Sequence, residues 1–235
     1  MKPLDRVQLV KVQPGQSRSG HYVLDEWFEA VVKPRLKGEA YEIRFADDFI
    51  LCFQYREDAE KVLDVLTKRF AKYGLTLHPE KTRLMEFGQQ ALTTSEEQGG
   101  RKPATFDFLG FTHICKRSRR GYFTIHVRTM RKRLRRSLKK VTAWCREHRH
   151  DPVEEQQEAL NRKLGGHYQY YGRSTNFRSL GEFYQGVRRI WHQWLNRRTR
   201  GNTLNWLEYE QLLRRHPLLR PRITRPWKSG PVPVS

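Results

Sequence analysis

Cysteine is scarce in this chain, and its three cysteines are too far apart for a zinc ribbon or a disulfide framework. Cys52, Cys115 and Cys145 form no Cys-x-x-Cys pair, so we expect reduced, buried thiols in a cytoplasmic protein. Long apolar runs are also missing, and Met1-Lys-Pro-Leu-Asp-Arg6 contains no apolar segment. The sequence therefore predicts neither a membrane-spanning helix nor a secretory leader, and no membrane partner.

Acidic residues are few and unevenly placed. The chain has 46 Lys and Arg against 25 Asp and Glu, a formal net charge of +21. Residues 1–115 hold 17 of each sign, whereas residues 116–235 hold 29 basic and 8 acidic residues. Because 12% of the residues are aromatic, the basic half is no simple disordered tail. A foldable basic module favours a polyanionic partner, with nucleic acid ahead of an anionic membrane surface.

Hydrophobic periodicity predicts an α+β first half. Apolar residues recur at helical spacing over 21–36 and over 57–73. We expect short strands at 75–78 and 82–87, a polar surface loop at 88–104, and paired strands at 105–112 and 121–127 joined by a basic turn at 116–120. The helices should pack on one small antiparallel sheet.

The second half is predicted to be helical. Helices are expected at about 127–145, 154–171, 177–199 and 203–215, followed by an extended or disordered tail after Pro217. The first of these helices has one apolar stripe, and its other faces carry Lys and Arg. The glycine pair Gly165-Gly166 is expected to permit close helix approach.

Two adjacent carboxylates, Asp47 and Asp48, lie between apolar runs in Tyr41-Glu-Ile-Arg-Phe-Ala-Asp-Asp-Phe-Ile-Leu-Cys-Phe53. The flanks have the β-branched and aromatic character of strands, which predicts a tight hairpin with both acids at its tip. Two neighbouring carboxylates repel each other, and a divalent cation such as Mg²⁺ removes that repulsion. A solvated turn is the competing interpretation, since Asp is a common turn residue.

Three segments in order resemble the palm of a reverse transcriptase of the group II intron type. Phe45-Ala-Asp-Asp48 resembles the aromatic-x-Asp-Asp motif of the catalytic hairpin, and Leu77-His-Pro-Glu-Lys-Thr82 resembles a later palm motif with its lysine. Phe108-Leu109-Gly110-Phe111 resembles the primer-grip strand. The resemblance implies two-metal phosphoryl transfer with Mg²⁺. Asp47 would be the main metal ligand and Asp48 a supporting one, with Lys81 as a candidate proton donor.

A second resemblance covers the helical half. Leu160-Asn-Arg-Lys-Leu-Gly-Gly-His-Tyr-Gln-Tyr-Tyr-Gly172 and the segments after it resemble the maturase-specific thumb of intron-encoded proteins. This implies a structured RNA partner, namely group II intron RNA, or an RNA/DNA primer-template. The basic side chains assigned to RNA are Arg131, Arg133, Arg135, Arg136, Lys139, Lys140, Arg188, Arg189, Arg197 and Arg198. Tyr168, Tyr170 and Tyr171 could stack on bases or pack in the core, and the basic runs could also be solvated faces.

The chain departs from the palm pattern upstream of the hairpin. A working palm needs an earlier strand carboxylate, but only Asp5 and Asp25 among the Asp residues precede Asp47, and neither has the expected context. We also expect the fingers to be missing, and therefore no independent polymerase activity. The expected organisation is an atypical segment (1–20), a partial palm (21–127), a helical thumb or maturase domain (128–223) and an extended tail (224–235).

Three hypotheses follow from this pattern. The first is a reverse transcriptase/maturase-like protein that binds intron RNA and assists splicing. The second is one half of a split polymerase, completed in trans by an upstream reverse transcriptase half. The third is a non-catalytic basic RNA- or DNA-binding protein that reuses the fold.

Overall fold

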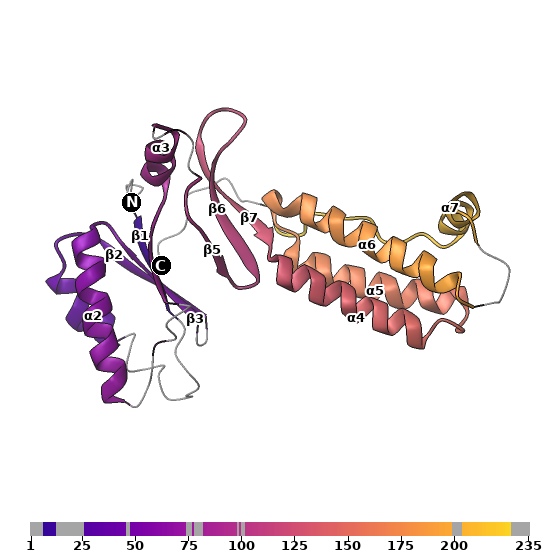
Figure 1. Cartoon of the computed structure of the whole chain (residues 1–235), viewed down its shortest axis with the longest axis horizontal. Coiled ribbons are helices and arrows are strands. Elements are labelled where there is room, and N and C mark those ends of the chain that lie inside the picture. The colour runs from indigo at the N-terminus through magenta and orange to yellow at the C-terminus, as the bar shows by residue number, and fades with distance from the viewer. Residues whose placement is uncertain are drawn as a thin grey trace. The chain divides into compact units, whose positions relative to one another are not determined.

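The chain divides into two compact units, Met1–His126 and Val127–Ser235, which are coloured from indigo to yellow along the chain in Figure 1. The computed structural model describes the backbone of residues 7–12 and residues 26–45, 48–73, 77, 82–97, 99, 102–198 and 204–226. Elements of both classes are present, with antiparallel sheets in the first unit and helices in the second. The α+β prediction is confirmed.

The first unit is built on a four-stranded sheet with the order β2-β3-β1-β4. The strands are β1 (Val7–Val12), β2 (Ala40–Phe45), β3 (Asp48–Phe53) and β4 (Arg83–Phe87). β1 is antiparallel to both of its neighbours, β3 and β4. The sequence pattern does not predict β1, although this strand joins the β2–β3 hairpin to β4.

One face of this sheet packs against helix α2 (Arg56–Lys72). Phe49, Leu51 and Phe53 alternate along β3 and point to the same core, as the two-residue period of a strand requires. α2 contributes Ala59, Val62, Leu66 and Phe70 at helical spacing, and the rings of Phe49 and Phe70 stack with centroids 6.3 Å apart.

The turn before β2 is fixed to the start of α2. The buried Asp58 carboxylate accepts the backbone N–H groups of Lys37 and Gly38 at 3.0 and 3.1 Å. A Cβ on Gly38 would lie 2.6 Å from the ring of Tyr55, so a larger residue there would require the Tyr55 side chain to move. A single irregular helical segment, η1 (Phe28–Val32) and η2 (Lys33–Arg35), precedes the turn.

A smaller core lies on the other face of β3 and includes a second, three-stranded sheet, β5-β6-β7. Its strands are β5 (Thr105–Phe108), β6 (Phe111–Arg117) and β7 (Phe123–Thr129). Ile50, Phe87 and Phe108 meet in this core together with Leu92. Leu92 belongs to helix α3 (Gln89–Glu97), so the prediction of a loop throughout 88–104 is wrong.

The second unit contains three long helices, α4 (Arg131–Glu147), α5 (Val153–Tyr171) and α6 (Phe177–Leu195), and the shorter α7 (Trp206–Arg215). Figure 1 shows α4, α5 and α6 running side by side. Leu160, Leu164, Tyr168, Leu180 and Trp191 are fully buried in their common core. The predicted helices match these elements apart from their ends.

Close helix approach occurs at a glycine other than the predicted pair. A Cβ on Gly186 of α6 would lie 2.6 Å from the Leu138 side chain of α4, whereas Gly166 has open space around it. The nearest atom to a Cβ on Gly165 would be 3.6 Å away, an ordinary contact. Gly186 therefore allows α4 and α6 to pack, and the prediction for Gly165-Gly166 is wrong.

The segment after α7 runs back along α5, and we call residues 217–225 the return segment. Its backbone is bonded to α5 at both ends: Asn161 Nδ2 donates to Pro217 O (3.1 Å), and Thr224 N donates to Gly172 O (3.0 Å). In between, the Tyr168 hydroxyl donates to Leu219 O at 3.0 Å. The return segment is extended as predicted, but Leu218 is buried.

Candidate functional site

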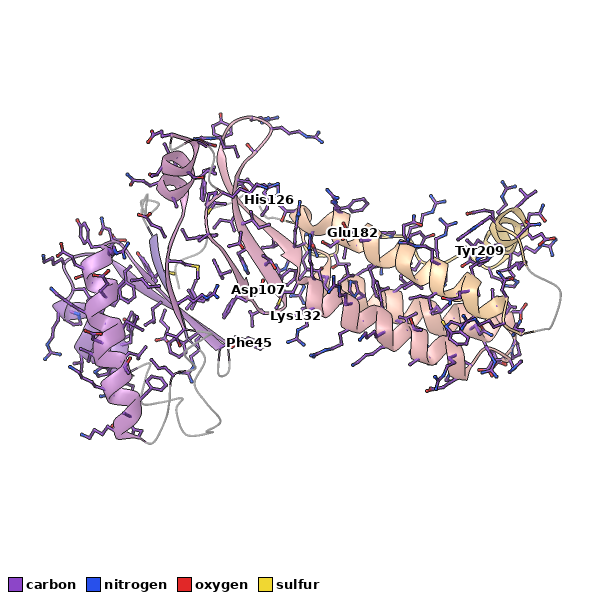
Figure 2. The ribbon with its side chains drawn as sticks, in the orientation of Figure 1. Phe45, Asp107, His126, Lys132, Glu182 and Tyr209 are labelled. Atoms are coloured by element: carbon purple, nitrogen blue, oxygen red, sulfur yellow. The ribbon has the colours of Figure 1, made fainter. Side chains whose placement is uncertain are left out.

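The predicted acidic hairpin is formed by β2 and β3. Phe45 pairs with Asp48 across the ladder, so two residues separate the paired ends of β2 and β3, as the tight-turn prediction requires. Asp48 is half-buried at the start of β3, and Phe45, labelled in Figure 2, is exposed where β2 ends. Asp47 is outside the described residues.

β1 lies directly beside the acidic hairpin and brings no carboxylate to it. Val12, the last residue of β1, pairs with Phe49, one residue after Asp48. The strand reads Val-Gln-Leu-Val-Lys-Val, and no Asp or Glu occurs between Asp5 and Asp25. Among the described residues, no group of three or more His, Cys, Asp or Glu could hold a metal.

Within the described residues, the donor set does not fit a two-metal centre. Two divalent ions need carboxylates on both sides of the site to offset their charge, whereas Asp48 is the one described carboxylate at the β2–β3 turn and β1 carries none. Reverse transcriptases as a family use divalent metals, but the neighbouring strand of this chain supplies only apolar, amide and amine side chains. Lys81, the predicted proton donor, lies outside the described residues, which resume at Thr82 before β4.

The predicted primer-grip segment forms a tight hairpin rather than one continuous strand. Phe108 pairs with Phe111, and the loop residues Leu109 and Gly110 have φ angles of 49° and 79°. Positive φ at both positions is the signature of a type I′ turn. A leucine rarely adopts this conformation because its Cβ crowds the backbone. The prediction of a single strand at 105–112 is therefore wrong, and Leu109 is held against its conformational preference.

The main basic surface of the second unit is the solvent side of α4. Leu134, Leu138 and Val141 face the core, while seven cations between positions 131 and 140 are exposed. They are Arg131, Lys132, Arg133, Arg135, Arg136, Lys139 and Lys140. None of them forms a salt bridge with another described residue, and Glu147 is the helix's single acid.

This arrangement opposes the stability of the helix itself. Cations in a first helical turn are repelled by the positive end of the helix dipole, at about 0.3–1 kcal/mol each. α4 begins with three of them, Arg131 to Arg133, and no side chain caps its first turn. Lys132, visible at this end of α4 in Figure 2, belongs to the same surface, although the predicted set of RNA-binding residues omits it.

The remaining predicted RNA-binding residues divide into exposed and engaged side chains. Arg189 and Arg197 are exposed, the latter with its guanidinium 4.8 Å from the ring centroid of Trp194. Arg188 is mostly buried and pairs with Glu210. Arg198 donates to the backbone carbonyls of Arg149 and Asp151. Arg188 and Arg198 thus have partners within the helical unit, and their assignment to RNA stays a prediction.

The three predicted tyrosines have different environments. Tyr168 is 0% exposed and its hydroxyl is bonded to the return segment, so it cannot stack on a base, and its assignment is wrong. Burial also raises the pKa of the Tyr168 hydroxyl above its usual value. Tyr170 is 52% exposed, while Tyr171 is half-buried with its ring centroid 4.6 Å from that of His167. Tyr170 is the most exposed of the three, with its ring packed edge-on against Tyr171 at a centroid distance of 4.7 Å.

The cysteines and buried histidine of the described chain are structural. All three thiols are free; Cys115 and Cys145 are buried and Cys52 is half-buried. Burial raises the pKa of the Cys145 thiol to about 12, which keeps it protonated and unreactive. Burial also lowers the pKa of His167 to about 4. No helix in the described part of the chain is both long and apolar enough to cross a membrane.

Two comparisons with known proteins bear on these sites. No curated protein matches the chain. Residues 21–113 match the family model described as reverse transcriptase (RNA-dependent DNA polymerase), a range that contains the acidic hairpin and the Phe108–Phe111 turn but neither β1 nor α4. The match is a similarity to reverse transcriptases over residues 21–113, less than half of the chain, and it stops before the helical unit.

Proposed function

We propose that this protein is a group II intron reverse transcriptase/maturase-like protein that binds structured RNA, including intron RNA, and assists its splicing. The observation that carries the proposal is the exposed cationic surface of α4. Seven like charges along ten residues of helix, or about 15 Å, repel one another unless a polyanion neutralises them. The reverse transcriptase match adds nucleic acid as the natural polyanion.

The geometry of an α-helix selects the cations that face outward together. Successive residues are rotated by about 100°, so Lys132, Arg136 and Lys139 project opposite the apolar stripe of Leu134, Leu138 and Val141. These three are the residues best placed to contact phosphates along one backbone. Phosphate contacts position a protein on nucleic acid without reading its sequence, so preference for intron RNA would come from its folded shape.

The test compares RNA affinity of the full chain at several salt concentrations. The logarithm of the binding constant should fall linearly with the logarithm of the salt concentration. The slope should be about −0.7 to −0.9 for each neutralised phosphate. Replacing Lys132, Arg136 and Lys139 with Gln should reduce this slope by about 2 to 3. The matched control neutralises Lys61, Lys68 and Lys72, which are exposed cations of α2, and should leave the slope near that of the parent protein.

Two results would contradict RNA binding through α4. A flat salt response removes any phosphate-driven account, and equal slope changes in both triple variants would show that net charge, not the α4 surface, is responsible. Affinity for a folded intron RNA no higher than for a duplex of equal length would favour the alternative of a general basic RNA- or DNA-binding protein.

We further infer that the chain alone does not synthesise DNA. The supporting observation is β1, whose residues beside the acidic hairpin contain no acid, so charge neutralisation of two Mg²⁺ ions is incomplete. Primer extension on an RNA template should give no product at any Mg²⁺ concentration that leaves the protein folded. Processive extension that disappears in Asp47→Ala would refute this inference.

The split-polymerase alternative makes a distinct prediction at the same place. A second chain that supplies the missing carboxylate on a strand would have to take the position of β1 between β3 and β4. Co-expression with an upstream reverse transcriptase half should then restore primer extension, and deletion of residues 1–12 should increase it. If primer extension is restored and Asp47→Ala does not abolish it, the two chains do not share one active site.

A further inference from the structure

The turn between β6 and β7 is a closed, well-bonded hairpin tip, formed by residues 118–122. Gly121 N donates to Ser118 O at 3.0 Å, which closes a β-turn with Arg119 and Arg120 at its two central positions. Ser118 N donates to Tyr122 O at 2.7 Å, and Gly121 has a φ of 82°. This is the arrangement of a three-residue hairpin loop with a glycine bulge.

Arg117 anchors the tip to helix α3. Its Nε lies 3.0 Å from both carboxylate oxygens of Glu96, and its Nη2 lies 2.7 Å from Oε2. Its Nη1 also donates to Gly121 O at 3.3 Å. A planar guanidinium that bonds a carboxylate with two nitrogens fixes orientation as well as distance. The side chains of the tip are therefore presented from a defined backbone.

Those side chains are cationic and aromatic, and they are exposed. Tyr122 is 71% exposed, and Lys116, Arg119 and Arg120 are exposed without a salt bridge to any other described residue. No Asp or Glu occurs between Asp107 and Glu147, so the sequence around the tip offers these cations no nearby acidic partner. Packing within the first unit gives no account of an exposed ring beside two unpaired guanidinium groups.

We propose that the β6–β7 tip binds an unpaired stretch of nucleic acid, with Tyr122 stacked on a base and Arg119 and Arg120 on the adjoining phosphates. Phosphates supply the charge that the tip lacks. An exposed aromatic ring can stack only on a base whose face is free, which is the case in single strands, loops and bulges but not inside a duplex. The tip therefore discriminates unpaired from paired nucleic acid.

This site is separate from the surface that carries the proposed function. It lies in the first unit, outside residues 21–113 that match the reverse transcriptase family, and it uses none of the α4 cations. The two surfaces also differ in chemistry, because α4 presents cations to a phosphate backbone, whereas the tip adds an aromatic ring for a base.

The test measures affinity of the full chain for a labelled single strand and for a duplex of the same length. Tyr122→Ala should weaken binding of the single strand by about 5- to 150-fold, the range for loss of one base–aromatic stack, and change duplex binding less than about twofold. Tyr122→Trp should restore single-strand binding, and Arg119→Gln with Arg120→Gln should lower its salt dependence. Tyr73→Ala, which removes another exposed tyrosine of the first unit, is the control and should change neither.

The outcomes separate this proposal from the function proposed for α4. Loss of single-strand preference in Tyr122→Ala supports the tip even if the α4 variant binds RNA normally. Unchanged single-strand affinity in Tyr122→Ala, or an equal loss of affinity for single strand and duplex, overturns the proposal for the tip. Neither result affects the proposal that α4 binds RNA. An acidic protein as the true partner of the tip would also leave the ratio of the two affinities unchanged, and so would count against the proposal.

Discussion

The helical unit should lose stability as the pH falls below neutrality because of one buried histidine. His167 lies in the core with its ring stacked on Phe183 at a centroid distance of 3.7 Å, and no described group bonds its buried Nε2. Burial among these rings lowers its pKa from 6.5 to about 4. A charged imidazolium there would lose its hydration without gaining a counter-charge.

The sign and size of the effect follow from that difference in pKa. Between pH 6.5 and about 4 the unfolded chain binds a proton at this histidine and the folded chain does not, so protonation favours unfolding. The contribution of His167 to stability is therefore intact above pH 6.5 and is lost as pH falls toward 4. At 1.36 kcal/mol for each pH unit of the gap, the loss approaches about 3 kcal/mol.

Tryptophan fluorescence during urea unfolding at a series of pH values is a suitable assay. Five of the six tryptophans (Trp144, Trp191, Trp194, Trp206 and Trp227) belong to the second unit, so the signal follows that unit. His167→Phe keeps a ring against Phe183 and should flatten the pH dependence between 6.5 and 5. His150→Gln, at an exposed histidine, is the control. Equal slopes in the parent protein and in His167→Phe would refute the reasoning.

Three further perturbations test the packing. Asn176→Ala removes bonds of 2.8–2.9 Å to Thr129 and to Tyr171 O at a fully buried site, and should cost about 3 kcal/mol in urea unfolding; a loss under about 1 kcal/mol would contradict the buried network. Leu109→Asn should be more stable than Leu109→Val by at least about 1 kcal/mol, because Asn tolerates positive φ and Val does not; the reverse order would rule out the type I′ turn. Gly172→Ala places a Cβ 2.3 Å from Tyr168 O, and should speed trypsin cleavage of the return segment; an unchanged rate would argue against its docking.

The elements recovered from sequence are those whose patterning is local. α5 and α6 have long apolar stripes, so periodicity located them well. Periodicity does not predict α3, because Leu92 is its only fully buried side chain. Its sequence, Gln-Gln-Ala-Leu-Thr-Thr-Ser-Glu-Glu, resembles a polar loop. β1 pairs with partners about forty to eighty residues away, and nothing in its own six residues specifies them.

The candidate sites were predictable only in part for a similar reason. The acidic hairpin carries its information in thirteen adjacent residues, which were enough to predict a tight hairpin between two strands. Tyr168 and Tyr170 are neighbours on one helix, and only the packing of α5 reveals which of them faces the core. The β6–β7 tip was recognised as a basic turn, but the exposure of Tyr122 depends on the fold.

The return segment has a consequence for how the protein can be handled. Hydrogen bonds join residues 168–172 to the return segment. The stretch of chain between them, which contains α6 and α7, therefore has both of its ends held together. Breaking these bonds would remove the constraint on the ends of this segment and leave α6 held by its packing against α4 and α5 alone. A C-terminal tag or fusion partner therefore belongs beyond Arg225, whereas shortening the chain to Pro217 should loosen α6 although it removes no residue of that helix.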